Sequence, residues 1–313
     1  MATSKPLKIG TRGSPLALAQ ARETRDRLRA AHADLRADEA IEIVVVKTSG
    51  DTILDKPLAD IGGKGLFTRE IDEAMLDGRI DLAVHSMKDV PTWLPDGIDL
   101  SCVLPREDVR DVFISNKADS LGALPAGAVV GTASLRRRAL ILAKHPRLKV
   151  ETFRGNVQTR LKKLEAGIVD ATMLAKAGLN RLGLSDVATD VIETADLLPA
   201  VAQGAIGVAR RIGDERIQDY LKSLNCRETG YRVAAERAFL SVLDGSCRTP
   251  IAALAEMDDA GTMVFKGLCA RPDGTEIIET FRRGPMSDAE RIGRDAGEEL
   301  KALITPDFFV SEH

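Results

Sequence analysis

Short apolar runs alternate with amphipathic stretches in the first third of the chain, a pattern typical of strands that alternate with helices. The β-branched run at residues 41–47 and the apolar run at 79–84 each predict a strand. Helices are expected over residues 16–29, where Ser14 can cap the first turn, and around residues 67–76. This order predicts a parallel or mixed sheet that is covered by helices.

The alternation restarts after Pro105 and then changes near residue 225. Further strands are expected at residues 112–114, 128–131, 149–153 and 171–174, with helices from residue 135 and over 157–168. A strand at 204–210 is expected to return to the first sheet. From 225 onward, a helix at 232–243, antiparallel strands at 251–255, 263–269 and 275–281, and a last helix at 288–303 predict a small α+β domain. We therefore predict three domains: residues 1–104 with about 204–222, residues 105–203, and residues 225–313.

Composition indicates a globular protein and argues against a general nucleic-acid-binding surface. Of the 313 residues, 44% are apolar and 29% are charged, and the net charge is −3 with a single Trp. This balance argues against binding to nucleic acid or to an anionic membrane. No apolar run approaches the length of about 18 residues that a membrane span needs, and the start lacks a signal-peptide core, so a cytoplasmic protein is expected.

The run from Ala83 to Pro91 joins the end of an apolar strand to a group of polar side chains. A histidine, a serine, Lys88 and Asp89 follow the strand before proline ends the element. Ligands of α/β proteins bind at this carboxyl end of the strands. If the backbone stays extended, Lys88 and Asp89 point to opposite sides, which suits one cation for an acidic substrate and one carboxylate for the chemistry. A solvated charge pair at the surface is the alternative.

Arginines gather at strand-to-helix junctions in the middle of the chain. Arg136, Arg137 and a third arginine fall in the first turn of a helix capped by Ser134, where cations oppose the helix dipole. A bound carboxylate or phosphate would offset that repulsion. Other basic or polar positions at such junctions are Arg154, Arg160, Arg181, Arg12, Ser14 and Lys88. Together they predict a basic cleft between two domains, with surface ion pairs as the alternative.

Cys247 lies beside Arg248 in a loop between a predicted helix and a predicted strand. Most cysteines are packing residues, which is the alternative here, but a neighbouring cation lowers the pKa of a thiol and an exposed loop permits attack, and both favour a chemical role. The remaining cysteines (Cys102, Cys226 and Cys269) lie in or beside apolar elements and are expected to be structural. No C-x-x-C pair is present, so no metal site is predicted. The glycine-rich run 62–65 lacks the spacing of a phosphate loop and is expected to act as a lid.

Motifs across nearly the whole chain resemble those of the porphobilinogen deaminases, also called hydroxymethylbilane synthases. In family order, the matching runs are residues 11–12, 14–18, 62–67, 83–91, 130–132, 134–137, 154–157, 159–161, 177–179, 203–205 and the loop around Cys247. The resemblance implies two α/β domains with mixed sheets, like those of periplasmic binding proteins, that face each other across a cleft, and a small C-terminal α+β domain. It also implies a monomeric cytoplasmic enzyme of porphyrin and heme biosynthesis that hands its product to the next pathway enzyme.

The same resemblance implies the reaction and its residues. A dipyrromethane cofactor is held by a thioether to Cys247, four porphobilinogen molecules are condensed onto it with loss of ammonia, and water releases hydroxymethylbilane. Asp89 is then the catalytic carboxylate, which binds pyrrole N–H groups and stabilises an azafulvene-like cation. The residues implied to bind cofactor or substrate are Arg12, Ser14, Lys64, Phe67, Lys88, Thr132, Ser134, Arg136, Arg137, Arg154, Arg160, Arg181 and Gln203, the last near a hinge.

Several positions depart from the family pattern, yet none removes a predicted catalytic group. Gly13 stands where Gln is common, Ala133 where Ser is common, and Asp60 where Lys is often found. The cysteine loop reads Gly-Ser-Cys-Arg-Thr-Pro, so that Arg248 offers an additional cofactor contact.

Two other functions compete with this interpretation. One is an anion-binding receptor of the periplasmic type, against which the missing signal peptide and the Cys247 loop both count. The other is a hydrolase that uses Cys247 as nucleophile with His85, which no spacing in the sequence supports.

Overall fold

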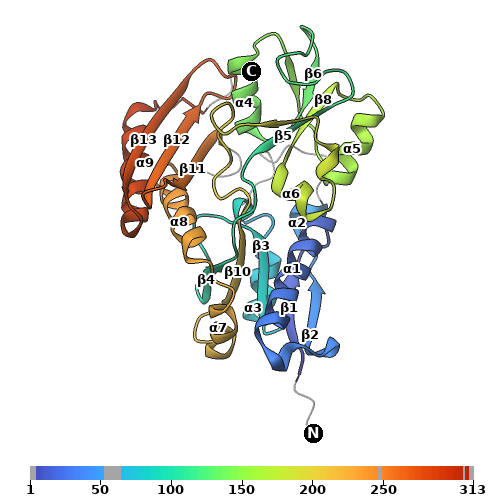
Figure 1. The fold of residues 1–313 in the computed structure, drawn as a ribbon, viewed down its shortest axis with the longest axis vertical. Coiled ribbons are helices and arrows are strands. Elements are labelled where there is room, and N and C mark those ends of the chain that lie inside the picture. Colours follow the sequence, from blue (N-terminus) through green and yellow to red (C-terminus); the bar gives the residue numbers. More distant parts are fainter. Residues whose placement is uncertain (1–4, 53–64, 245–248, 306, 310–313) are drawn as a thin grey trace. The chain divides into compact units, whose positions relative to one another are not determined.

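The computed structural model describes residues 5–52, 65–244, 249–305 and 307–309 (Figure 1). The chain divides into two compact units. Of the described residues, unit 1 holds 5–52, 65–106 and 205–230, and unit 2 holds 107–204, 231–244 and those from 249 onward. The chain thus passes from unit 1 to unit 2 and back before it enters unit 2 again.

Unit 1 is built on a mixed five-stranded sheet. Its strands, in spatial order, are β2 (Ile41–Val45), β1 (Leu7–Thr11), β3 (Leu82–Ser86), β10 (Ile206–Arg211) and β4 (Ile98–Val103). β1 runs parallel to β2 and β3, whereas β10 runs antiparallel to β3 and β4. The strand expected at 204–210 therefore does return to the first sheet.

Helices cover both faces of this sheet. They are α1 (Pro15–Ala31), α3 (Arg69–Leu76) and α7 (Glu215–Lys222), while the short helix α2 (Ser49–Thr52) follows β2 in the chain. Leu28 of α1 packs in one buried cluster with Val84, and Met75 of α3 packs in a second with Ala83. Val84 and Ala83 are neighbours on β3, so their side chains lie on opposite faces. Helices α1 and α3 are thereby fixed to the two sides of the central strand.

Unit 2 contains a second mixed sheet of five strands. Its strands, in spatial order, are β7 (Lys149–Glu151), β6 (Val129–Gly131), β8 (Ala171–Ala175), β5 (Asp111–Ser115) and β9 (Asp190–Ile192). The helices here are α4 (Leu135–Lys144), α5 (Val157–Glu165) and α6 (Lys176–Arg181). β6 is parallel to β7 and β8, and β5 is antiparallel to β8 and β9.

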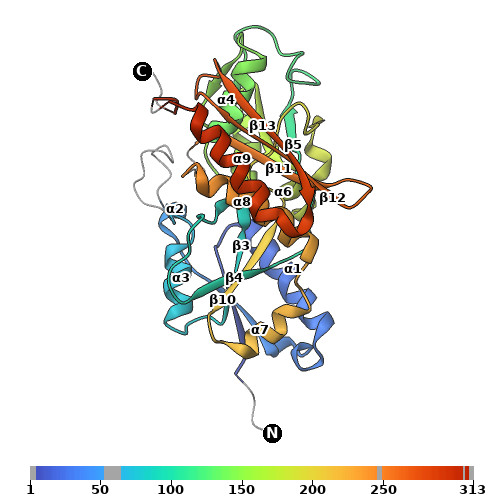
Figure 2. The same cartoon turned by 90° about the vertical axis from the view of Figure 1, so that its left-hand side faces the viewer.

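The C-terminal part is an antiparallel sheet of β11 (Ile251–Met257), β12 (Thr262–Ala270) and β13 (Ile277–Pro285), with helix α9 (Ala289–Leu303) (Figure 2). Helix α8 (Arg227–Val242) precedes it. Leu254 and Leu268 share a buried cluster with Phe113 and Leu140 of the α/β part of unit 2. The small sheet thus has a continuous core with its neighbour, and the division into three domains stays a prediction.

Local structure differs from the sequence-based expectations at a few places. Lys88 and Asp89 are not extended, because Met87–Asp89 forms a 3-10 turn directly after β3. Ile168 was expected on the apolar face of a helix, but α5 ends at Glu165 and Ile168 is 60% exposed. The sequence pattern did not predict β4, β9, α2, α6 and α7. The other 3-10 turns are Ala33–Leu35, Asp38–Ala40, Ser185–Val187 and Met286–Asp288.

Candidate functional site

A pocket in unit 1 lies where β1 and β3 end and helix α1 begins. Its lining consists of Arg12, Ser14, Leu16, Ala17, Gln20, Phe67, Thr68, Val84, His85, Ser86 and Asp89. Ser14 caps α1 by accepting a hydrogen bond from the backbone N–H of Ala17. Strand ends and helix starts that meet at one edge of a sheet form the usual ligand position of an α/β protein.

Asp89 and Arg12 are the charged residues of the pocket lining. The Arg12 Nη1 atom lies 4.0 Å from Asp89 Oδ2, and their side chains are 22% and 33% exposed. The guanidinium also lies over the ring of Phe67, 4.2 Å from its centroid. Because both charged groups keep contact with solvent, their pairing leaves the carboxylate accessible to a ligand. Lys88 is half-buried on the same turn as Asp89.

Gln20, Ser86 and His85 also line the pocket, although the family resemblance implied no role for them. The Gln20 side-chain amide donates to Ser86 Oγ at 2.8 Å, which links α1 to the end of β3. His85 is 6% exposed. Burial, with the Arg12 charge as a smaller cause, lowers the pKa of His85 to about 4, so its imidazole is neutral near pH 7. The strand pattern does identify positions 85 and 86 as lying near a strand end, but it does not show that they share a pocket with Gln20.

In unit 2, the arginines at the start of α4 converge on a buried carboxylate, that of Asp111 on β5. Asp111 Oδ2 accepts from Arg136 Nη2 at 2.6 Å, and Oδ1 accepts from Arg137 Nη2 at 2.7 Å. Arg136 and Arg137 are 4% and 5% exposed, and Asp111 is fully buried. Burial alone would raise the pKa of Asp111, but the two guanidinium charges outweigh it and hold that pKa well below its usual range. The anion expected at this helix start is therefore supplied in part by the chain itself.

Positive charge remains in excess around this carboxylate. The Nε atoms of Arg136 and Arg137 are buried and have no hydrogen-bond partner among the described residues. Arg160 at the start of α5 donates through Nε to the Gly155 carbonyl at 2.9 Å. Burial, together with repulsion from Arg137 and Arg154, lowers the pKa of Arg160 to about 10. Two cations buried against one carboxylate, with a third desolvated nearby, form an electrostatic environment that an anionic ligand would stabilise.

Two of the predicted residues donate hydrogen bonds to backbone carbonyls near residue 204, where the chain leaves unit 2 for unit 1. Gln203 Nε2 donates to the Val109 carbonyl at 2.8 Å and to Asp111 Oδ1 at 2.9 Å. Arg181 Nη2 donates to the Gly204 carbonyl at 3.0 Å. Gly204 has φ +87°, and a Cβ there would lie 2.4 Å from the carbonyl oxygen of Glu107. Only glycine fits this close approach of two chain segments.

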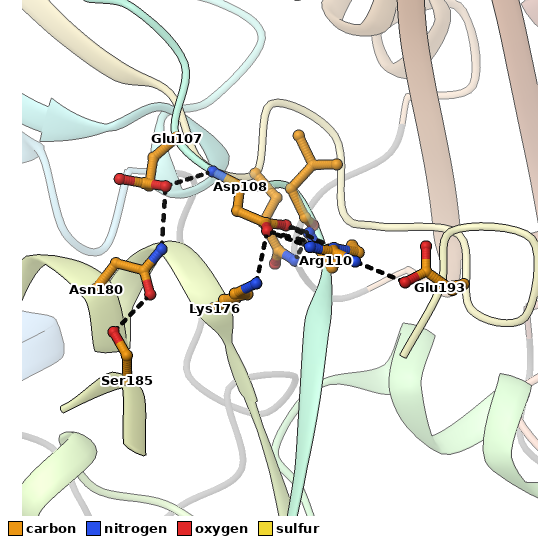
Figure 3. Close-up of polar contacts among 9 residues, drawn as sticks. Glu107, Asp108, Arg110, Lys176, Asn180, Ser185 and Glu193 are labelled. Atoms are coloured by element: carbon orange, nitrogen blue, oxygen red, sulfur yellow. Dashed lines mark hydrogen bonds and ion pairs between the residues drawn. The ribbon is translucent and has the colours of Figure 1, made fainter. Parts of the chain in front are cut away.

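An ionic network surrounds the same segment of unit 2 (Figure 3). Asp108 accepts from Arg110 and Lys176, and Arg110 also pairs with Glu193 at 2.6 Å. Glu107 accepts from the side-chain amide of Asn180 at 3.1 Å. These contacts hold the chain after Arg106 against α6, and the sequence offered no signal for them, because their members are far apart along the chain.

The remaining predicted residues lie at a helix start or outside the described part of the chain. Thr132 follows β6 and accepts from the Ser134 N–H, and Ser134 in turn caps α4 by accepting from the Arg137 N–H. Lys64 and Cys247, together with Asp60 and Arg248, lie outside the described residues. Of the other cysteines, Cys102 and Cys269 are buried, and burial raises the pKa of both thiols to about 12.

The described part of the chain holds no group of side chains suited to a metal ion. Among its helices, none is long and apolar enough to cross a membrane.

Comparisons with known proteins place these features in a family. Residues 7–219 match the family model described as "Porphobilinogen deaminase, dipyromethane cofactor binding domain", and residues 231–302 match its C-terminal domain. A chloroplastic porphobilinogen deaminase from Oryza sativa subsp. japonica is 62% identical over 307 residues, which is 97% of this chain and 86% of the relative. A porphobilinogen deaminase from Paracoccus denitrificans is 57% identical over 304 residues, 97% of this chain and 96% of the relative.

Among solved structures, the methionine binding protein MetQ is 13% identical, with a TM-score of 0.45 over 74% of this chain and 95% of that one.

Proposed function

The chain belongs to the porphobilinogen deaminase family, and from this membership we propose that Asp89 is the catalytic carboxylate of its reaction. The protein condenses porphobilinogen units head to tail, with loss of ammonia, on a dipyrromethane cofactor, and releases hydroxymethylbilane. Each step of this reaction requires either a group that stabilises positive charge on a pyrrole or a group that binds a carboxylate.

The observation that supports the role of Asp89 most strongly is its position in the pocket of unit 1. Asp89 is the one carboxylate among the described residues that line this pocket, and it stays one-third exposed beside Arg12. Loss of ammonia from porphobilinogen develops positive charge on the pyrrole ring and its methylene carbon. A fixed carboxylate stabilises that charge and accepts hydrogen bonds from the pyrrole N–H. Phe67 offers an aromatic face for the ring.

The cation excess in unit 2 supports a site for the cofactor, which carries several carboxylates. Arg136 and Arg137 have buried Nε atoms without a hydrogen-bond partner among the described residues, and Arg160 is desolvated beside other cations. These features fit a polycarboxylate, since each added anion relieves repulsion between guanidinium groups. The residues that we assign to holding it are Thr132, Ser134, Arg136, Arg137, Arg154 and Arg160, with Cys247 as the attachment point. When bound, the cofactor supplies a pyrrole with a free α-carbon to which the first unit is joined.

Substrate carboxylates are assigned to the remaining basic and hydroxyl groups. These residues are Arg12, Ser14, Lys64, Lys88 and Arg181, with Gln203 at the return to unit 1. Each porphobilinogen brings an acetate and a propionate, so that a growing chain requires more cations than a single substrate would.

Three further properties belong to the same proposal. We place the enzyme in the cytoplasm as a monomer that hands its product to the next enzyme of the pathway. We divide it into three domains, residues 1–104 with about 204–222, residues 105–203, and residues 225–313. Size-exclusion chromatography with light scattering tests the monomer directly, and a dimer at micromolar concentration would contradict it.

Substitution of Asp89 tests the central assignment. Asp89→Asn keeps the shape of the side chain but removes its charge, and we expect ammonia release to fall by about 10²-fold or more, in the range of positioned catalytic groups. Asp96→Asn is the matched control, because Asp96 is exposed and lies outside the pocket lining. Circular dichroism and intact-protein mass confirm that each variant is folded and carries cofactor. Ammonia release by folded Asp89→Asn at the rate of the control would overturn the assignment.

The attachment point has its own test. We expect the intact mass of the purified protein to exceed the chain mass by two linked pyrroles, and Cys247→Ser to abolish the excess. Cys226→Ser, which changes a half-buried free cysteine, should retain it. A Cys247→Ser protein that keeps the covalent excess would contradict attachment at this position.

A further inference from the structure

His85 is a buried residue in the lining of the pocket that also contains Asp89. His85 is the fourth residue of β3, and it lines the pocket together with Arg12 and Asp89. Only 6% of the residue is exposed. Its neighbour Ser86 accepts a hydrogen bond from the Gln20 side-chain amide. A neutral imidazole in a pocket lining has a ring nitrogen that can accept a proton.

The surroundings of His85 define its chemical state. Helix α1 contributes Gln20, whose amide donates to Ser86, and the turn before α3 contributes Phe67 and Thr68 to the lining. The charged group that acts on the imidazole is Arg12. With a pKa lowered to about 4, the ring is unprotonated at neutral pH and has a free lone pair.

We propose that His85 is a second catalytic residue, whose imidazole accepts the proton lost from the pyrrole α-carbon each time a porphobilinogen unit receives the next. This inference rests on the proposed location of the reaction in the Asp89 pocket.

Atoms and charges balance in this step. The incoming unit loses its ammonium group as NH3, which leaves a cationic methylene carbon. The α-carbon of the preceding porphobilinogen unit forms a C–C bond to that methylene. Its C–H bond then breaks, the electron pair restores the aromatic pyrrole, and the proton bonds to an imidazole nitrogen of His85. The imidazolium finally passes the proton to NH3, so that the cycle releases ammonium.

Two proton-handling groups in one pocket allow a division of labour. If Asp89 took the α-proton, it would lose the charge that stabilises the cation. A neutral imidazole can take that proton while Asp89 stays ionised beside Arg12. A weak base suffices, because a protonated pyrrole carbon is a strong acid, and a weak base also releases the proton readily for the next cycle.

The test compares kcat for porphobilinogen that carries hydrogen at its free α-carbon with kcat for porphobilinogen that carries deuterium there. In the wild-type holoenzyme we expect no isotope effect on kcat, since a positioned base makes proton removal fast. His85→Asn retains a polar side chain but no base. For it we expect kcat to fall by about 10²-fold, the range for a proton-transfer residue, with little change in KM, and a primary isotope effect to appear on kcat. His145→Asn, a half-buried histidine of unit 2, is the matched control and should behave as wild type.

Intact-protein mass after a single addition of the deuterated substrate gives a second readout. Deuterium should be lost more slowly from protein that carries added porphobilinogen units in His85→Asn than in the control. His85→Gln, whose side chain is closer in volume to histidine, is tested by the same measurements. The variant that folds decides the question. Turnover like the control, or a loss of kcat without an isotope effect, overturns the proposal for His85. Normal turnover by Asp89→Asn would instead remove the premise that the reaction occurs in this pocket.

Discussion

Replacing Asp111 with asparagine should destabilise the protein far more than its single lost charge suggests. Asp111 is fully buried and accepts hydrogen bonds from Arg136 at 2.6 Å, Arg137 at 2.7 Å and Gln203 at 2.9 Å. The neutral amide of Asp111→Asn would leave two guanidinium groups without their buried counter-charge. Removal of one partner from a buried ion pair costs about 3–5 kcal/mol, and we expect this loss in the free energy of unfolding.

A surface ion pair provides the matched control for Asp111→Asn. Lys144 and Asp196 lie 3.1 Å apart with side chains 46% and 70% exposed, so Asp196→Asn should cost about 0–1 kcal/mol. Urea unfolding followed by circular dichroism measures both variants. A loss for Asp111→Asn that is no larger than that for Asp196→Asn would refute the dependence of the buried arginines on this carboxylate.

Acid titration checks the same dependence in the wild-type protein. The pKa of Asp111 in the folded state lies below its unfolded value of about 3.9, so the unfolded state binds more protons between the two. The contribution of Asp111 is therefore complete above about pH 4 and is lost as the pH falls through the folded-state pKa. Asp111→Asn should flatten the acid side of the stability profile, and an unchanged acid slope would count against it.

Two further predictions concern stability. Burial raises the pKa of Asp72 to about 6, so between about pH 4 and 6 the folded state binds a proton that the unfolded state has lost, and stability falls as the pH rises through this range. We therefore expect Asp72→Asn to raise Tm at pH 7.5 but not at pH 4. Equal changes in Tm at the two pH values would refute this reasoning. Gly293→Ala would place a Cβ 1.9 Å from the Ala235 carbonyl oxygen and should lower Tm, whereas Gly230→Ala, whose nearest neighbour would be 3.7 Å away, should be neutral or stabilising by about 0.5–1 kcal/mol. Equal thermal unfolding of these two variants would contradict the close packing of α8 and α9.

Periodicity identified most of the elements, because burial on one face imposes a regular spacing of apolar residues. The strand at 41–47, the helix ending at Leu76 and the antiparallel C-terminal strands all occur where the pattern predicts them. The errors have local causes. Proline at position 91 and the polar run before it allow a 3-10 turn at Met87–Asp89, and the helix of residues 157–168 ends early at Glu165. Short elements such as β9 and α2 carry too few residues to show a period.

Motifs in the sequence by themselves determined the family, the chemistry and the candidate residues, because these depend on residue types in a fixed order. The partners of those residues were decided only by the tertiary structure. Asp111 meets Arg136 and Arg137 across 25 and 26 positions of the chain, and the charge that acts on His85 is that of Arg12, which follows β1. Whether an arginine is paired, or a histidine neutral, depends on burial and on charges brought close by folding. A linear pattern contains no such distance, and so it could name these side chains but not their electrostatic state.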